Sequence, residues 1–184
     1  MISHTRKYIF VHINKTGGTS VEAKLRKISK HHGNKHYNII KYRNLANNEH
    51  GFENYFKFTI VRNPWDRLVS NYFFRKRRGK STSISFKDWV VKNKFDGCNA
   101  KHTQLSWISD ETGELIIDFI GRFENLQEDF NIICERIGVP HQQLAHKNKS
   151  KHKHYTEYYD EETKQIVAEK YAKDIEYFGY KFGE

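Results

Sequence analysis

Hydrophobic runs that suit buried strands alternate along this chain with patterns that suit helices, and the clearest pair stands near its start. Tyr8 to Ile13 is an almost continuous run of aromatic and β-branched residues. Such a run is typical of a strand covered on both faces, as in a parallel sheet. After it come a glycine turn and then Val21, Leu25 and Ile28 at helical spacing. The pattern predicts a strand, a tight turn and a helix start within Lys7 to Glu22.

A second strand is predicted from Tyr55 to Val61, where aromatic and β-branched residues again dominate. It leads into Asn63, a good N-cap, and Pro64, a favoured first helical residue. The positions that follow have the i, i+3, i+4, i+7, i+8 spacing of a core-facing helix. They are occupied by Trp65, Leu68, Val69, Tyr72 and Phe73. The second strand is therefore predicted to be followed by a well-delimited helix.

A third strand is predicted from Leu115 to Phe123, and Asn125 with Glu128 resembles a capping box that begins the next helix. Other helices are predicted at Ile39 to Leu45, at Phe86 to Val90 and after Asp160. Strands that alternate with helices predict an α/β fold. We expect a P-loop-like three-layer sandwich in which helices flank a short central parallel sheet. No repeat or linker divides the sequence, so residues 1–184 are expected to form a single domain.

The turn after the first strand has the composition of an anion-binding loop. Its residues are Lys15, Thr16, Gly17, Gly18, Thr19 and Ser20. Adjacent glycines let the backbone curl so that several N–H groups converge, and the following helix adds the positive end of its dipole. A Walker A loop would carry its lysine after the glycines, whereas Lys15 precedes them. The loop therefore predicts a phosphate or sulfate site unlike an ordinary ATP loop; the alternative is a turn that only joins strand to helix.

A second anion site is predicted where the second strand ends. Arg62 directly follows that strand, and Ser70 lies two turns into the next helix, on a face that is not the apolar one. Both side chains are expected to point into a crevice at the carboxyl edge of the sheet, where open α/β folds bind ligands. A guanidinium and a hydroxyl suit a phosphate. The alternative is that the arginine satisfies a helix end and the serine bonds back to its own helix.

Composition limits the classes of partner and the cellular compartment that we expect for this protein. The formal net charge is +10, which favours nucleotide phosphates, nucleic acid, acidic polysaccharide or a membrane surface as partners. Cys98 and Cys134 are the only cysteines and form no CxxC pattern, so neither a disulfide framework nor a cysteine-based zinc site is indicated. The sequence enters its first strand without a pattern for a signal peptide or a membrane anchor. We therefore expect a soluble, cytoplasmic protein that does not insert stably into a membrane.

Two anion sites at adjacent strand ends suit a ligand with two separate phosphates, and these residues resemble a known family. KTGGTS at 15–20 and VRNPWDRLVSNY at 61–72 are similar to the paired 5′-phosphosulfate and 3′-phosphate motifs of the sulfotransferases. The resemblance is in particular to sulfotransferase family 2, the carbohydrate branch related to the heparan and chondroitin 2-O-sulfotransferases, and to its bacterial or viral members. The resemblance spans most of the chain, through GRFENLQEDF, NKSKHKHYTEYYDEET and YAKDIEYFGY.

The resemblance implies transfer of a sulfuryl group from 3′-phosphoadenosine 5′-phosphosulfate (PAPS) to a hydroxyl of a saccharide or glycan, without a metal. By the same resemblance the Lys15 to Ser20 loop would hold the 5′-phosphosulfate, and Arg62 with Ser70 would hold the 3′-phosphate. Lys15 would also stabilise the charge that grows on the departing nucleotide. Three residues before the last helix are candidates to close over the nucleotide, or else belong to a solvated basic loop: Lys149, Ser150 and Lys151.

The acceptor hydroxyl must lose a proton, so a positioned base is expected, and histidine is the usual choice. His36 matches the place where family members carry their catalytic histidine, and it begins the segment after the first strand–helix unit. His50, in a polar turn before the second strand, is the alternative. His102 and Gln104 are weaker candidates for contact with acceptor or nucleotide.

Two other function classes remain open from the sequence. A nucleotide or sugar kinase with a variant phosphate loop would need Mg²⁺ and carboxylates directed at the phosphates, and no such pair is evident beside the Lys15 loop. A basic nucleic-acid-binding module is suggested only by the charge, and it would show steeply salt-dependent binding. The sulfotransferase interpretation is preferred, with no nucleic-acid partner.

Overall fold

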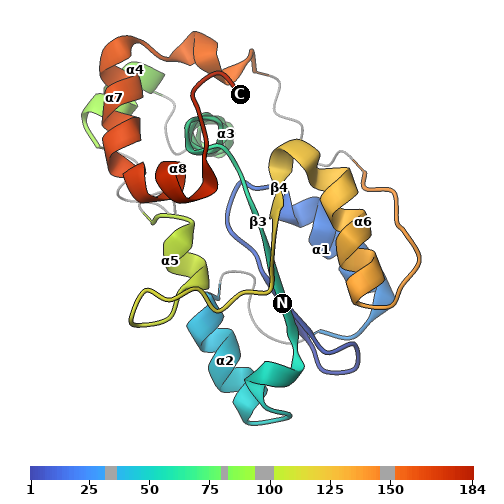
Figure 1. The fold of residues 1–184 in the computed structure, drawn as a ribbon. Helices are drawn as coiled ribbons and strands as arrows, with labels where there is room; N and C mark the ends of the chain where they lie inside the picture. The colour runs from blue at the N-terminus through green and yellow to red at the C-terminus, as the bar shows by residue number, and fades with distance from the viewer. Residues whose placement is uncertain (32–36, 80–82, 94–101, 146–151) are drawn as a thin grey trace. The chain divides into compact units, whose positions relative to one another are not determined.

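A computed structural model of the protein describes residues 1–31, 37–79, 83–93, 102–145 and 152–184 (Figure 1). The chain falls into two units. Unit 1 comprises Met1–Val61 and Gln104–Lys147, and unit 2 comprises Arg62–Thr103 and Asn148–Glu184.

Unit 1 contains a mixed sheet of four strands in the order β1-β2-β3-β4. The strands are β1 (Ile2–Ser3), β2 (Tyr8–Val11), β3 (Phe56–Val61) and β4 (Phe119–Arg122). β1 runs antiparallel to β2, whereas β2, β3 and β4 are parallel to one another. Val11 pairs with Thr59, and Val61 pairs with Arg122, so the three parallel strands end at a common edge. The predicted parallel sheet is confirmed, with a short antiparallel strand added at its edge.

Helices cover both faces of this sheet, which gives the predicted α/β sandwich (Figure 1). On one side lie α1 (Gly18–Ile28) and α6 (Leu126–Arg136), and on the other lie α2 (Ile39–Asn47) and α5 (Leu105–Ile108). The hydrophobic spacing predicted α1 and α2 closely. α5 was not predicted, because a helix of four residues is too short to show a helical period.

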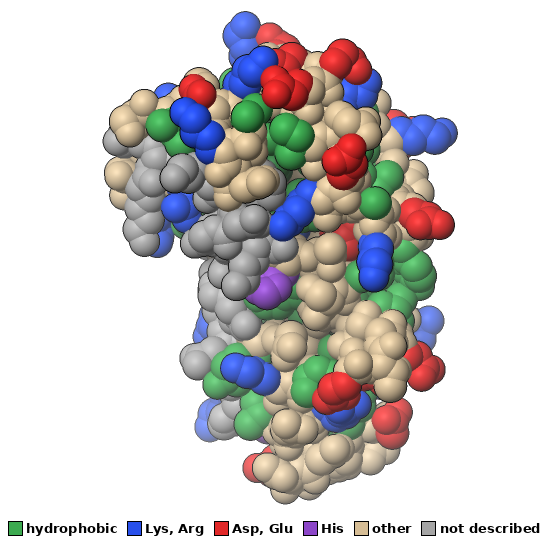
Figure 2. Space-filling view, turned by 90° about the vertical axis from the view of Figure 1, so that its left-hand side faces the viewer, with side chains coloured by type: hydrophobic (Ala, Val, Ile, Leu, Met, Phe, Trp, Pro, Cys, Tyr) green, Lys and Arg blue, Asp and Glu red, His purple; other side chains and the backbone are tan. Residues whose placement is uncertain are grey.

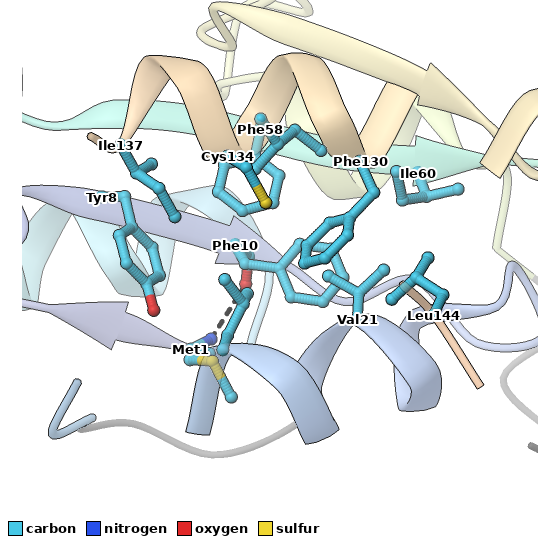
Figure 3. Close-up of a cluster of buried hydrophobic side chains, with 12 residues drawn as sticks. Met1, Tyr8, Phe10, Val21, Phe58, Ile60, Phe130, Cys134, Ile137 and Leu144 are labelled. Atoms are coloured by element: carbon cyan, nitrogen blue, oxygen red, sulfur yellow. Dashed lines mark hydrogen bonds between the residues drawn. The ribbon is translucent and has the colours of Figure 1, made fainter. Parts of the chain in front are cut away.

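The main core of unit 1 lies between the sheet and the pair α1 and α6 (Figure 3). Tyr8 and Phe10 of β2 point into it beside Phe58 of β3, while Val21 of α1 and Phe130 of α6 close it. All five side chains have no exposed surface. Burying a side chain of this size stabilises the fold by about 1.5–3 kcal/mol. This cluster holds β2 and α1 in place on either side of the Lys15 loop.

In the described part of unit 2, four α-helices gather around aromatic side chains. They are α3 (Pro64–Arg77), α4 (Phe86–Val91), α7 (Glu161–Lys170) and α8 (Ala172–Phe178). The core includes Trp65, Tyr72, Phe86, Trp89, Tyr155 and Tyr171. The predicted Asn63 cap is confirmed, because its side chain accepts a hydrogen bond from the Trp65 N–H at the start of α3. The Asp160 cap is also confirmed, as a capping box with Thr163.

Three local predictions were wrong. The third strand begins only at Phe119, because Leu115 forms a bridge with Ser109 and the Ile116 N–H bonds to the Ile108 carbonyl. Asn125 makes no capping hydrogen bond, since a 3-10 turn over Phe123–Asn125 leads directly into α6. The last helix is not continuous, because it is interrupted at Tyr171 between α7 and α8.

Candidate functional site

The loop predicted to bind an anion connects β2 to α1 and curls tightly. The Thr16 hydroxyl donates to the Ile13 carbonyl at 2.9 Å, and the Ser20 N–H donates to the Gly17 carbonyl at 2.9 Å. Lys15 and Gly17 have φ angles of 69° and 83°, in the left-handed region that residues other than glycine rarely adopt. The loop therefore has a specific, sharply turned backbone.

Each of the two glycines is required for a separate reason. Gly17 has a positive φ, and a β-carbon added there would lie 2.8 Å from Leu126 Cδ2 and 2.9 Å from Phe123 Cδ2. At Gly18 a β-carbon would lie 2.3 Å from Cδ2 of His12. Contacts this short force neighbouring atoms to move, so larger residues are excluded without repacking. The glycines let the loop pack directly on β2 and on the segment after β4.

The N-terminus of α1 is suited to receive an anion. In the part of the chain that the structure describes, no side chain caps this helix end, and its first turn contains no acidic residue. The first N–H groups of a helix have no partner within the helix, and the helix dipole makes this end positive. Lys15 lies just before it and is half-buried. Together these features would suit the binding of a phosphate or sulfate.

Other hydroxyls of the loop are already engaged. Ser20 is 7% exposed, and its hydroxyl donates to the Ala145 carbonyl at 2.9 Å. Thr16 is fully buried and bonds within the loop. These two hydroxyls therefore hold the loop and its neighbour in shape.

A buried contact between a histidine and a glutamate, which was not predicted, lies beneath the loop. His12 Nδ1 is 3.1 Å from Glu22 Oε1, and these side chains are only 4% and 6% exposed. His12 directly follows β2, and Glu22 lies in the second turn of α1. In the sequence His12 stands within a hydrophobic run, and only the return of α1 across the sheet brings Glu22 beside it.

The predicted second anion site belongs to unit 2. Arg62 is 8% exposed, and its Nε and Nη2 lie 2.8 Å and 2.7 Å from Oδ2 of Asp66. Ser70 is 3% exposed and lies in α3. A guanidinium oriented by Asp66 and a hydroxyl of α3 are therefore the two groups of the predicted phosphate site.

Of the candidate bases and the residues predicted to close over the nucleotide, the structure describes only some. His36, Lys149, Ser150 and Lys151 lie outside the described residues, so their roles stay predictions. His50 lies after α2, with its ring 6.4 Å from the ring of Tyr55. Tyr55 precedes β3, so His50 lies at the amino end of that strand, whereas the Lys15 loop follows the carboxyl end of the parallel strand β2.

The two weaker candidates occupy structural positions. The backbone carbonyl of His102 accepts a hydrogen bond from Arg67 at 3.3 Å in unit 2. Gln104 is fully buried at the N-cap position of α5 in unit 1. Their contact with an acceptor or a nucleotide stays a prediction.

Charge is mixed on the surface that can be inspected. On the face drawn in Figure 2, lysine and arginine side chains are interspersed with aspartate and glutamate. In unit 2, for example, Lys87 Nζ lies 2.6 Å from Asp160 and 3.1 Å from Glu162. Within the described ranges, no group of three or more His, Cys, Asp or Glu side chains is gathered as in a metal site. No helix in those ranges is long and apolar enough to cross a membrane.

Comparison with known proteins decides the family. A sequence model of the sulfotransferase family matches residues 1–181. This chain belongs to the sulfotransferase family. The sulfotransferase is 27% identical over 118 residues to carbohydrate sulfotransferase 14 of Danio rerio, a match that covers 50% of this chain and 32% of that protein. It is also 33% identical over 100 residues to an uncharacterised protein of Archaeoglobus fulgidus, covering 48% of this chain and 72% of that protein. No solved structure matches this sulfotransferase.

Proposed function

We propose that this sulfotransferase moves a sulfuryl group from PAPS to a hydroxyl of a saccharide or glycan. The observation that carries the proposal is the loop at the start of α1, where two required glycines and Lys15 lie at a helix end that no described side chain caps. The family membership supports a sulfuryl donor. The printed name of the Danio rerio relative supports a carbohydrate acceptor.

PAPS supplies an activated sulfuryl group whose leaving group is a phosphate. In the proposed reaction a bond forms between the acceptor oxygen and sulfur as the bond from sulfur to the phosphate oxygen breaks. Negative charge then grows on the 5′-phosphate. The N–H groups of the first turn of α1 are held in place by the helix, and Lys15 lies just before them, so together they would stabilise this charge.

The remaining roles fall to residues outside that loop. Arg62, oriented by Asp66, and the Ser70 hydroxyl would bind the 3′-phosphate. His36 would take the proton from the acceptor hydroxyl as the hydroxyl oxygen attacks sulfur, which makes that oxygen a better nucleophile. No role for a metal enters this proposal.

The proposal is tested by supplying PAPS labelled with radioactive sulfur together with a panel of desulfated glycosaminoglycans, neutral glycans and simple alcohols. We expect label on a glycan, release of adenosine 3′,5′-bisphosphate and no effect of EDTA. Label on an alcohol or phenol but on no glycan would remove the carbohydrate acceptor. Phosphate transfer from ATP with Mg²⁺, without sulfuryl transfer, would favour the kinase alternative.

A further inference from the structure

His12 touches the phosphate loop from its buried side. A β-carbon at Gly18 would lie 2.3 Å from Cδ2 and 2.5 Å from Nε2 of His12, so the edge of the imidazole occupies the space that a side chain at Gly18 would need. Gly18 is the first residue of α1. The histidine ring therefore lies against the backbone whose N–H groups form the anion cradle.

Phe10 and Glu22 are two of the residues that contact this ring. Its face stacks on Phe10, with ring centroids 5.6 Å apart and planes inclined by 13°. Its Nδ1 lies 3.1 Å from Oε1 of Glu22, whose side chain is 6% exposed. One neighbour belongs to β2 and the other to α1, so the ring spans the two elements that the loop connects.

A buried pair of this kind is costly compared with hydrophobic residues of the same volume. Removing a carboxylate and an imidazole from water costs several kcal/mol for a charged pair, and apolar replacements are often neutral or stabilising. The surrounding core is built from Phe10, Val21 and similar side chains, which would accept an apolar residue. The pair thus invites an explanation beyond stability.

We propose that His12, oriented by Glu22, is a positioning residue that holds the Gly18 backbone, and with it the N–H groups at the start of α1, in the anion-binding conformation. This inference rests on the proposed function of the loop in donor binding. His12 itself touches neither donor nor acceptor in this account. It acts by keeping the competent loop conformation highly populated.

The key variant is His12→Asn. The asparagine amide nitrogen can take the place of Nδ1 beside Glu22, but the ring edge beneath Gly18 is lost. If the competent loop then falls to about one tenth of the population, the dissociation constant for adenosine 3′,5′-bisphosphate rises about tenfold. The melting temperature without ligand is measured in parallel, since a purely structural loss would lower it without changing the affinity of the folded fraction.

A second variant, Gly18→Ala, tests the same contact independently of His12→Asn. Gly18→Ala in the wild-type protein forces its methyl group against the ring and should weaken bisphosphate binding. In the His12→Asn background the methyl group enters vacated space, so the same substitution should restore binding in part. This reversal of sign is a double-mutant coupling between the two positions. A methyl group that only obstructed the ligand would weaken binding in both backgrounds.

An exposed histidine–glutamate pair on the surface of unit 1 provides a matched control. His141 Nε2 pairs with Glu135 at 2.8 Å in unit 1, but these side chains are 55% and 64% exposed. His141→Asn should leave bisphosphate affinity unchanged. This inference alone would be overturned if the wild-type protein and the His12→Asn variant bound bisphosphate equally well. It would also be overturned if Gly18→Ala had the same effect in both backgrounds. Wild-type protein that does not bind bisphosphate would overturn the proposed function and this inference together.

Discussion

Asp66 holds the guanidinium of Arg62 at the start of α3, with 2.7 Å between Arg62 Nη2 and Asp66 Oδ2. The two side chains are only 10% and 19% exposed, so water screens the pair less than it screens a surface pair. Asp66 thereby fixes the direction of the guanidinium before any ligand arrives. An oriented arginine loses less conformational freedom on binding than a flexible lysine, which suits it to recognise a phosphate.

Arg62→Ala should weaken nucleotide binding more than it slows the chemical step. A hydrogen bond to a charged group contributes about 1.5–3 kcal/mol, so the dissociation constant for adenosine 3′,5′-bisphosphate should rise by roughly 10-fold to 150-fold. Isothermal titration calorimetry measures this directly. Arg77→Ala, at an exposed position late in α3, makes the same change in net charge. Equal losses of bisphosphate affinity in both variants would mean that the change in net charge alone weakens binding, which would contradict the assignment of Arg62.

Lys15→Ala should show the opposite pattern. Losing one preorganised donor to a developing negative charge costs about two orders of magnitude in turnover, while the backbone N–H groups of α1 still bind the ground state. Bisphosphate affinity should therefore change little as sulfuryl transfer falls about 100-fold. A Lys15→Ala protein with normal turnover and only a raised requirement for PAPS would show that Lys15 binds rather than catalyses.

His36→Ala should separate proton transfer from donor binding. General base catalysis typically contributes 10²-fold to 10⁴-fold, so activity should fall by about that factor while bisphosphate still stabilises the protein. His50→Ala should retain activity, because His50 lies beside Tyr55 at the amino end of β3. Loss of activity in the His50 variant with a normal His36 variant would transfer the role of base to His50.

Tyr8 gives a test of the fold in alkaline solution. Burial raises the pKa of its hydroxyl to about 12, and the hydroxyl lies 3.0 Å from Ser29 Oγ and 2.6 Å from His31 Nε2. A pKa raised in the folded state stabilises the fold fully below the unfolded pKa of about 10. That contribution is lost as the pH rises from about 10 to 12.

The free energy of unfolding in urea should be measured at several pH values for the wild-type protein and for Tyr8→Phe. The wild-type protein should lose more of its free energy of unfolding over that range than the variant, because only it must ionise the buried hydroxyl. Identical pH dependence in the two proteins would show that Tyr8 titrates normally and is more accessible to water than the structure indicates.

The features that the sequence predicted well depend on neighbouring residues. Asn63 with Pro64 marked the start of α3, and Asp160 marked the start of α7, because a cap is made by residues three or fewer positions apart. The Lys15 loop was likewise visible, since strand, glycines and helix follow one another directly. Local chemistry of this kind is readable without knowledge of the fold.

The features that were missed depend on contacts between distant segments. His12 and Glu22 meet only after α1 folds back on the sheet, so neither residue was distinguishable by its neighbours. Leu115 was assigned to a strand on its hydrophobicity, but pairing with Ser109 takes it out of the sheet. The need for Gly18 was predicted for its flexibility, whereas the structure adds a steric reason that only the position of His12 reveals.

The central claim, that the Lys15 loop and the Arg62 site serve a nucleotide carrying separate 3′- and 5′-phosphates, is tested most directly by thermal unfolding with nucleotide. Adenosine 3′,5′-bisphosphate at a hundredfold excess over its dissociation constant should stabilise the protein by about 2.7 kcal/mol, which raises the melting temperature by several degrees. EDTA should make no difference, and ATP should have much less effect. Greater stabilisation by ATP with Mg²⁺ than by the bisphosphate would contradict the account and favour a kinase.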